Sequence, residues 1–324
     1  MEDLDYPLVS IVMLNYNGLK YLKKTIPSVF ELDYPNYEFI IVDNGSTDGS
    51  IEFIKKFGNI RLIENRENLG YSKGKNIGIM KAKGEYILSL DNDILLVNKN
   101  ILTGLIRYYK EDMGFVQILF NDIGYENTKY YGIYFSIYGV NSHKNPISIS
   151  KIMNSKKQIL IGAPTGGCFF ISKNKWNFIG GFDESQPFNL DDLDVGARAW
   201  IYGFKNYLYI KFPAVHLGIN KTSSAESYSN RFRFVFSGHA RSMLKNYRLS
   251  NLIINFPLLF AFQFIKSIKY SVKKRSIKVF VAFLWSIVYF LKKLYETLKQ
   301  RKVIQSKRST KEDIFLKIKP LWFD

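Results

Sequence analysis

The sequence predicts an α/β fold with a largely parallel central sheet, followed by a basic helical extension. Strand and helix patterns alternate through residues 8–90, which is the order that builds a parallel sheet. Acidic residues follow several of the predicted strands, at the edge of the sheet where such folds bind their ligands. The charge is uneven: residues 1–230 carry 25 Lys and Arg against 24 Asp and Glu, whereas residues 231–324 carry 21 against 4.

The first part of the chain contains four strand patterns with a helix pattern between each pair. The run "LVSIVML" is continuously apolar and is soon followed by Asn-Gly, after which apolar residues recur at helical spacing. The cluster "NGSTDGS" after the second strand can cap the next helix. The expected elements are a strand over 8–14, a helix over 19–29, a strand over 37–43, a helix over 50–58, a strand over 59–65, a helix over 73–83 and a strand over 85–90.

The next part of the chain is less regular. A helix is expected over 100–109, and residues 121–157, rich in Tyr, Asn, Ser and Gly, predict irregular hairpins or loops. Residues 162–184 combine a Gly-rich turn, a short apolar strand and a helical turn. The acidic stretch "NLDDLD" then opens an amphipathic helix that ends at Gly203.

Cysteine and histidine usage excludes two kinds of site. The single cysteine, Cys168, excludes an internal disulfide, and His143, His216 and His239 do not have the spacing of a zinc site. The acidic N-terminus has the wrong sign for a secretory signal. These features favour a reducing, cytoplasmic setting.

The last third of the chain favours contact with an anionic surface. Two apolar runs, 252–265 and 277–291, are each shorter than the ~20 residues of a spanning helix, so interfacial or re-entrant helices at the cytoplasmic face of the cell membrane are expected. Packing of both helices on the protein's own core is the alternative. Nucleic-acid binding is disfavoured, because the aromatic residues lie within apolar runs and no reading motif is present. The bracketing basic residues are Lys266, Lys269, Lys273, Lys274, Arg275 and Lys278.

Carboxylates gather at strand ends and at one helix start. The sites are Asp43, the pair Asp91 and Asp93 in "SLDND", and the group Asp191, Asp192 and Asp194. Like charges held close together raise each other's pKa unless a cation compensates them. Mg²⁺ or Mn²⁺ takes such oxygen ligands, and Mg²⁺ is often shared between carboxylates and a substrate phosphate. The residues therefore predict a divalent cation and a diphosphate ligand.

Six blocks of the sequence resemble family 2 glycosyltransferases, which are inverting enzymes of the GT-A fold. The resemblance covers residues 7–218, and the third block is most similar to the rhamnosyltransferase-type branch. It implies a GT-A catalytic domain over 1–227, with a nucleotide-binding half over 1–96 and an acceptor half over 97–227, followed by the basic helical region 228–324. The blocks are "VSIVMLNYNG", "IIVDNGSTDGS", "ENLGYSKGKNIGI", "LSLDNDILL", "GGCFFISKNKWNFIGGFDE" and "DDLDVGARAWIYGFK".

The resemblance assigns roles on the nucleotide side of the site. It implies that Asn15, Tyr16 and Asp43 surround the base, with a stacking face on the tyrosine, and that the nucleotide pocket is shaped by Asn68, Gly70 and Asn76. Asp91 would contact the ribose or the metal, and Asp93 would ligate the metal on the two phosphates. The alternative is that the glycines serve as turn residues and Asp43 as a helix cap.

The resemblance also assigns the catalytic side. Asp192 matches the general base, while Asp191 stands where Glu is more usual, so the base assignment stays open between these neighbours. His216 matches a histidine that ligates metal or touches diphosphate, although a histidine at a strand end also has structural uses. Residues that would approach donor or acceptor are Thr165, Gly166 and Gly167.

Together these features predict metal-dependent, inverting sugar transfer from a nucleotide-diphosphate sugar to a saccharide acceptor on a membrane lipid. A polyprenyl phosphate as direct acceptor is a close alternative. A non-catalytic sugar-nucleotide-binding or scaffold protein is another alternative. The presence of every acid expected in an active site argues against it. A nicotinamide dehydrogenase is disfavoured, because no G-x-G-x-x-G follows the first strand.

Overall fold

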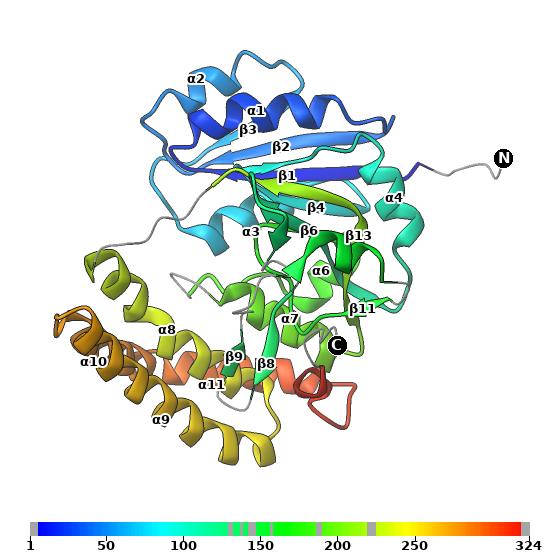
Figure 1. Cartoon of the computed structure of the whole chain (residues 1–324). Helices are drawn as coiled ribbons and strands as arrows, with labels where there is room; N and C mark the ends of the chain where they lie inside the picture. Colours follow the sequence, from blue (N-terminus) through cyan, green and yellow to red (C-terminus); the bar gives the residue numbers. More distant parts are fainter. Residues whose placement is uncertain are drawn as a thin grey trace.

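The computed structural model describes residues 6–128, 132–136, 139–141, 147–155, 158–185, 190–218 and 225–318. A mixed sheet forms its centre, with strand order β11-β13-β6-β12-β4-β1-β2-β3 and β5 paired to β13 (Figure 1). The strands are β1 (Val9–Asn15), β2 (Tyr37–Asp43), β3 (Ile60–Glu64), β4 (Tyr86–Asp91), β5 (Ile94–Leu95), β6 (Met113–Asp122), β7 (Asn127–Thr128), β8 (Tyr134–Ser136), β9 (Gly139–Asn141), β10 (Ile147–Ser148), β11 (Ile159–Leu160), β12 (Cys168–Ser172) and β13 (Lys205–His216).

The helices cover both faces of the sheet and form a separate layer below it in Figure 1. They are α1 (Leu19–Phe30), α2 (Ser50–Ile54), α3 (Tyr71–Lys81), α4 (Ile101–Tyr108), α5 (Ile149–Met153), α6 (Lys173–Ile179), α7 (Asp191–Ile201), α8 (Ala225–Asn246), α9 (Leu249–Lys273), α10 (Lys278–Lys292), α11 (Leu294–Ser306) and the 3₁₀ turn η1 (Ile314–Lys317). The elements expected over residues 8–109 are therefore confirmed, with α2 shorter than expected.

The parallel half of the sheet is buried on both faces. β1 pairs in parallel with β2 and β4, and β2 pairs in parallel with β3. Because side chains alternate along a strand, Ile11 and Met13 pack in the core that contains residues of α1 and α4, while Val12 packs in the core that contains residues of α3, α6 and α7. Burial on both sides explains why β1 reads as a continuous apolar run rather than an alternating one.

The strand order reverses direction at β1, which lies between β4 and β2. In such a sheet the loops after the two neighbouring strands diverge, and a crevice opens at their carboxyl ends. Asn15, Asp43 and Asp91 are the last residues of β1, β2 and β4, so they all lie at this edge. The expected position of these residues at the carboxyl edge of the sheet is therefore confirmed.

The other half of the sheet is mixed. β12 is antiparallel to both β4 and β6, whereas β6 and β13 are parallel. Residues 121–157 form short strands in two two-stranded sheets, β7 with β10 and β8 with β9, which agrees with the expected hairpins. Part of that region lies outside the described residues.

The C-terminal helices share a core with the sheet region. Phe236 of α8, Phe283 of α10 and Phe315 of η1 are buried in the same cluster as Trp200 of α7. The packing alternative from the sequence is therefore confirmed in part, since one face of these helices does pack on the protein. α9 is 25 residues long and apolar enough to cross a membrane by length and composition, so the expectation that both C-terminal helices are too short is wrong for α9.

Candidate active site

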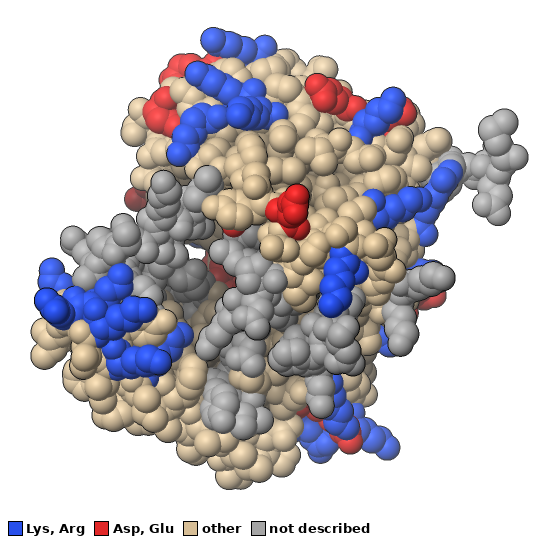
Figure 2. Space-filling view, in the orientation of Figure 1, with Lys and Arg blue, Asp and Glu red and all other residues tan. Residues whose placement is uncertain are grey.

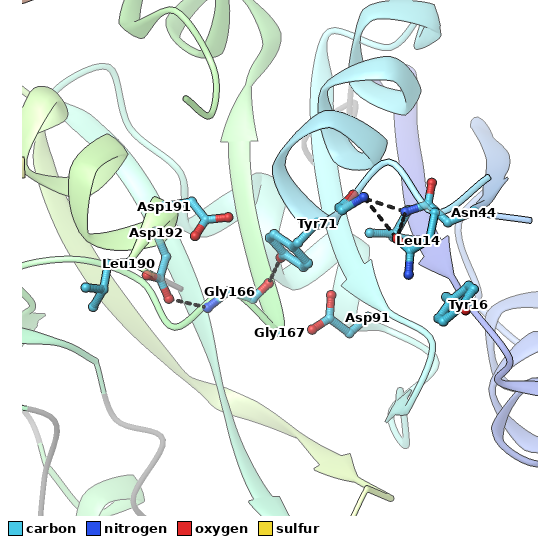
Figure 3. Close-up of a pocket in the computed structure, with 12 residues that line it drawn as sticks. Leu14, Tyr16, Asn44, Tyr71, Asp91, Gly166, Gly167, Leu190, Asp191 and Asp192 are labelled. Carbon is cyan, nitrogen blue, oxygen red and sulfur yellow. Dashed lines mark hydrogen bonds between the residues drawn. The ribbon is translucent and has the colours of Figure 1, made fainter. Parts of the chain in front are cut away.

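A pocket of about 430 Å³ lies at the carboxyl ends of the central strands (Figure 3). Tyr16 and Asn44 lie at one end of it, Asp191 and Asp192 lie at the other, and Asp91 is between them. Its lining is Leu14, Tyr16, Asn44, Asn68, Gly70, Tyr71, Asp91, Gly166, Gly167, Leu190, Asp191 and Asp192. Residues far apart in the sequence therefore form one cavity, whose lining contains the predicted site acids Asp91, Asp191 and Asp192 but not Asp93.

The end formed by β1 and β2 offers one exposed ring and several amides. The Tyr16 side chain is 48% exposed and its ring is available for stacking. Asn68 Oδ1 accepts a hydrogen bond from the Gly70 backbone N–H at 2.9 Å, and Asn44 Nδ2 donates to the Gly70 carbonyl at 3.0 Å. Gly70 has φ +82°, which glycine adopts without steric strain. Its loop therefore turns sharply into α3 along the wall of the pocket.

Asn15 and Asp43 form a buried network just behind this wall. Asn15 Nδ2 donates to Asp43 Oδ2 at 2.7 Å, and the Ser46 backbone N–H donates to Asp43 Oδ1 at 2.7 Å. Asn92 Nδ2 in turn donates to Asn15 Oδ1 at 2.7 Å. Neither Asn15 nor Asp43 lines the cavity, and their contact with a nucleotide base stays a prediction. The network ties the ends of β1, β2 and β4 together.

Asp91 has a buried cation beside it that the sequence reading did not identify. Lys75 Nζ lies 3.2 Å from Asp91 Oδ1 and also donates to the Leu90 carbonyl. Burial raises the pKa of Asp91 to about 6, although Lys75 opposes the rise. Burial likewise lowers the pKa of the Lys75 ammonium. The pair forms a fixed dipole in the floor of the pocket.

Asp93 and His216 meet just outside the pocket lining. Pairing of β5 with β13 brings His216 Nε2 to 3.2 Å from Asp93 Oδ2, and His216 Nδ1 lies 2.6 Å from Asp122 Oδ1. Burial lowers the pKa of His216, but the two carboxylates outweigh this effect and raise it to about 9. Within the described ranges, no group of three or more His, Cys, Asp or Glu side chains could hold a metal ion.

Asp192 is held by backbone donors rather than by a cation. The Gly166 backbone N–H donates to Asp192 Oδ2 at 3.1 Å, and the Leu193 backbone N–H donates to Oδ1 at 2.8 Å. Burial, with a smaller contribution from the charge of Asp191, raises the pKa of Asp192 to about 7. Burial also raises the pKa of Asp191, whose carboxylate accepts a hydrogen bond from Ser72 Oγ. Asp192 therefore has the pKa expected of a base that works near neutral pH.

The glycine pair lies between the two acids. A methyl group on Gly166 would lie 3.6 Å from Asp192 Oδ2, and one on Gly167 would lie 3.8 Å from Asp91 Oδ2. Tyr71 donates from its hydroxyl to the Gly166 carbonyl at 2.5 Å. The hydroxyl of neighbouring Thr165 is buried and has no hydrogen-bond partner among the described residues. Because neither glycine has a side chain, the backbone of Gly166 and Gly167 itself lines the cavity.

Asn76, which was predicted to shape the nucleotide pocket, also lies away from the cavity lining. Its side-chain NH₂ donates to the Phe182 carbonyl at 2.9 Å, and its Oδ1 accepts from the Phe182 N–H at 3.0 Å. Its nucleotide contact stays a prediction, and the contacts present tie α3 to the segment before α7. Leu190, directly before α7, has φ +78°, an uncommon conformation for a residue with a side chain.

Farther along α7, Asp194 belongs to a different network from Asp192. Lys245 Nζ of α8 donates to both Asp194 Oδ2 and Asp183 Oδ2 at 2.8 Å, and Arg241 Nη2 donates to Asp183 Oδ2 at 3.0 Å. Burial acts to raise the pKa of both carboxyls. Lys245 and Arg241 nevertheless hold the pKa of Asp183 below the ordinary value, and Lys245 and Arg198 do the same for Asp194. We call Asp183, Asp194, Arg241 and Lys245 the α7–α8 ion network. It fastens the helix of the candidate base to the C-terminal helices.

Comparison with known proteins agrees with this geometry. The family model for glycosyl transferase family 2 matches residues 10–177, which is about half of the chain. The chain is 32% identical over 151 residues to the glycosyltransferase GlyG of Streptococcus pneumoniae, over 45% of this chain and 49% of that protein. The chain thus spans about half the length of this curated relative. The similarity to a rhamnosyltransferase-type branch stays a prediction.

Two solved structures share the fold at low sequence identity. GalNAc-T7 with UDP, GalNAc and Mn²⁺ superposes with TM-score 0.60 and 16% identity, over 75% of this chain and 48% of that one. The mannosyltransferase PcManGT of Pyrobaculum calidifontis with GDP-Man and Mn²⁺ superposes with TM-score 0.57 and 15% identity, over 94% and 86%. The chain therefore belongs to glycosyl transferase family 2 and has a GT-A-like fold.

Proposed function

We propose that this glycosyltransferase moves a sugar from a nucleotide-diphosphate donor to a saccharide hydroxyl in a single inverting step, with Asp192 as general base. The observation that carries the proposal is the placement of Asp192 and Asp91 on either side of the Gly166–Gly167 backbone in one pocket. The pocket also offers Tyr16 and the Asn44 and Asn68 amides at its far end, where a nucleoside would lie.

Asp192 suits the base role through its surroundings. Two backbone N–H groups fix the carboxylate, so its orientation is set before the acceptor arrives. A base with a pKa of about 7 is partly unprotonated at neutral pH and still holds a proton well once it has taken one. The acceptor oxygen attacks the anomeric carbon as its proton passes to Asp192, and the bond to the diphosphate breaks on the opposite face. Asp191 keeps its place beside the base through Ser72.

Asp93 and His216 are the residues that would hold a divalent cation, Mg²⁺ or Mn²⁺. Their donor atoms converge to 3.2 Å, and Asp91 lies two residues before Asp93. A carboxylate leaves most coordination positions for diphosphate oxygens and water, which is the usual arrangement for Mg²⁺ at a phosphate substrate. His216 would have to release its proton to serve as a ligand beside Asp93. The cation, when bound, supplies positive charge that stabilises the departing nucleoside diphosphate.

The acceptor proposed is a saccharide carried on a membrane lipid. The support is the basic, apolar C-terminal region, which is built into the same core as α7. A lipid-linked acceptor would be held near the surface on which the protein lies, so the acceptor hydroxyl would be delivered at the edge of the pocket.

The test is nucleotide release with UDP-, GDP- and dTDP-sugars, with Mn²⁺, Mg²⁺ or a chelator, in the presence of lipid-linked saccharides. We expect metal-dependent turnover of one donor, lost in Asp93→Ala. Asp112→Ala is the matched control, because Asp112 is an exposed acid that pairs with Lys205 at the surface. Metal-independent turnover, or the absence of binding to any nucleotide sugar, would contradict the proposal.

A further inference from the structure

The C-terminal helices α9 and α10 carry a broad exposed apolar face. On α9 the exposed side chains include Ile253, Ile254, Phe260, Phe264, Ile265, Ile268 and Val272, and on α10 they are Val281, Leu284, Trp285, Val288 and Leu291. Soluble proteins rarely expose contiguous apolar area on this scale. Exposed large apolar residues of the sheet region, such as Met80 and Phe178, are by contrast scattered.

The fully buried positions of α9 are mostly polar, although Leu252 and Phe256 also pack against the core. The buried residues are Asn255, Leu259, Gln263 and Ser267, spaced four apart on one side of the helix. An ordinary surface helix has the opposite arrangement, with its apolar stripe toward the core. The apolar side of α9 is therefore left facing outward, and the helix is suited to an apolar surrounding on that side.

The apolar face is bordered by cations. Lys273, Lys274, Arg275 and Lys278 lie within six consecutive residues at the turn between α9 and α10. Figure 2 shows a dense Lys and Arg cluster at this turn, next to the largely uncharged surface of α9 and α10. α10 has no charged residue between Lys278 and Lys292. An apolar face with a basic border is suited to an anionic membrane surface. The apolar side chains enter the lipid, and the negatively charged headgroups attract each nearby Lys or Arg.

We propose that α9 and α10 lie together in the plane of an anionic bilayer, with their exposed apolar side chains among the acyl chains and the basic turn at the headgroups. Although α9 is long enough to cross a membrane, a crossing would expose Asn255, Gln263 and Ser267 to lipid and separate α9 from α8 and α10. Lying in the plane keeps these polar residues packed on the protein. This inference does not depend on the proposed chemistry.

The docking face would also orient the catalytic pocket. In Figure 1 the turn between α9 and α10 lies on the same side of the molecule as the carboxyl ends of β1 and β2, where the pocket opens. The α7–α8 ion network connects the docking helices to the helix of Asp192. The basic turn would therefore lie toward the side of the molecule on which β1 and β2 end.

The first experiment measures binding of the full chain to vesicles of phosphatidylcholine with and without phosphatidylglycerol. We expect strong cosedimentation with the anionic vesicles and weak binding to the neutral ones. The double variant Lys273→Gln/Lys274→Gln should lower the partition coefficient on the order of tenfold. Ile265→Glu/Val281→Glu should lower it at least as much, whereas Met80→Glu, an exposed apolar residue of α3, should not change it.

Circular dichroism of each variant controls for folding. Equal binding to both kinds of vesicle, or no binding to either, would overturn the proposal. So would a protein dimer, detected by light scattering, that Ile265→Glu/Val281→Glu dissolves, because the apolar face would then cover a second copy of the chain.

The second experiment separates an in-plane helix from a spanning one. Ser250→Cys and Lys273→Cys place a thiol at each end of α9, while the native Cys168 is buried. A membrane-impermeant maleimide is added to right-side-out and inside-out vesicles from cells that make the protein. We expect both thiols to react in the same vesicle orientation. Reaction of the two thiols in opposite orientations would show a span and overturn the in-plane arrangement.

Discussion

Asp192 and Asp194 lie two residues apart on the same helix, yet they occupy opposite electrostatic environments. Asp192 faces the pocket and accepts hydrogen bonds from backbone N–H groups alone within the described part of the chain, and its pKa is raised to about 7 by burial and by Asp191. Asp194 faces α8, and Lys245 of α8 together with Arg198 of α7 holds its pKa below the ordinary value despite burial. The comparison teaches that the cations folded against a carboxylate, rather than its place in an acidic motif, decide whether it is poised for chemistry or fixed as structure.

The largest expected effect is on catalysis at Asp192. Asp192→Asn keeps the hydrogen-bond geometry at the backbone donors but cannot take a proton, so kcat should fall by about 10²–10⁴-fold. The thermal midpoint should not fall, because no cation among the described residues pairs with this carboxylate. The measurement pairs steady-state nucleotide release with thermal unfolding. A variant that keeps wild-type kcat would remove Asp192 from the base role.

The second effect is on stability at Asp194. Lys245→Met removes the cation shared by Asp183 and Asp194 and leaves buried carboxylates less compensated, so the free energy of unfolding should fall by about 3–5 kcal/mol. Urea unfolding followed by circular dichroism measures the change. Lys205→Met is the matched control, because its pair with Asp112 is exposed and should contribute about 0–1 kcal/mol. Equal losses for both variants would break the comparison.

The third effect separates the two aspartates by pH. Asp192 must be unprotonated to act, so kcat/KM should rise with pH through about 7 and be low below it. Asp191→Asn removes a neighbouring negative charge and should move the rise to lower pH. A profile that is flat from mildly acidic to neutral pH would contradict the assignment.

The stability contributed by the ion network depends on pH in a lower range than the activity does. Because the pKa of Asp194 is lower in the folded chain than in the unfolded one, its contribution is present above the unfolded pKa and is lost as the pH falls through the folded pKa. Acid unfolding of the wild type should therefore be steeper than that of Lys245→Met, in which this contribution is reduced.

The smallest effect concerns the wall between the two acids. Tyr71→Phe removes the hydrogen bond from the tyrosine hydroxyl to the Gly166 carbonyl, a contact worth about 0.5–1.5 kcal/mol. Because the Gly166 N–H also donates to Asp192, kcat/KM should fall severalfold. The free energy of unfolding that Lys245 contributes through its ion pairs should not change. An effect as large as that of Asp192→Asn would mean that Tyr71 takes part in the chemistry itself.

Much of the fold could be predicted because its signals are local. Continuous apolar runs predict strands buried on both faces, and the acids that follow β2 and β4 lie at the expected edge. Lys75 was missed because a lysine in a helix usually faces solvent. Its burial follows from the small residues on the same face of α3: a methyl group on Gly74 would lie 2.5 Å from Leu14, and one on Gly78 would lie 2.5 Å from Val12.

Long-range pairing was beyond the sequence reading. Asp194 was grouped with Asp191 and Asp192 by proximity, whereas its partner Lys245 comes from a helix 51 residues later. The length of α9 was underestimated because Lys266 and Lys269 end the apolar run but not the helix. Both errors come from side chains whose partners or surroundings are set by tertiary packing.

The most direct test of the central claim is an NMR titration of ¹³C-labelled aspartate carboxyls in the wild type, Asp192→Asn and Asp194→Asn. The account predicts a carboxyl that titrates near pH 7 and disappears in Asp192→Asn, and a second that stays ionised below the ordinary aspartate pKa of about 3.9 and disappears in Asp194→Asn. If both carboxyls titrate together in the ordinary range, the two aspartates share one environment, and the division of α7 into a catalytic and a structural end is wrong.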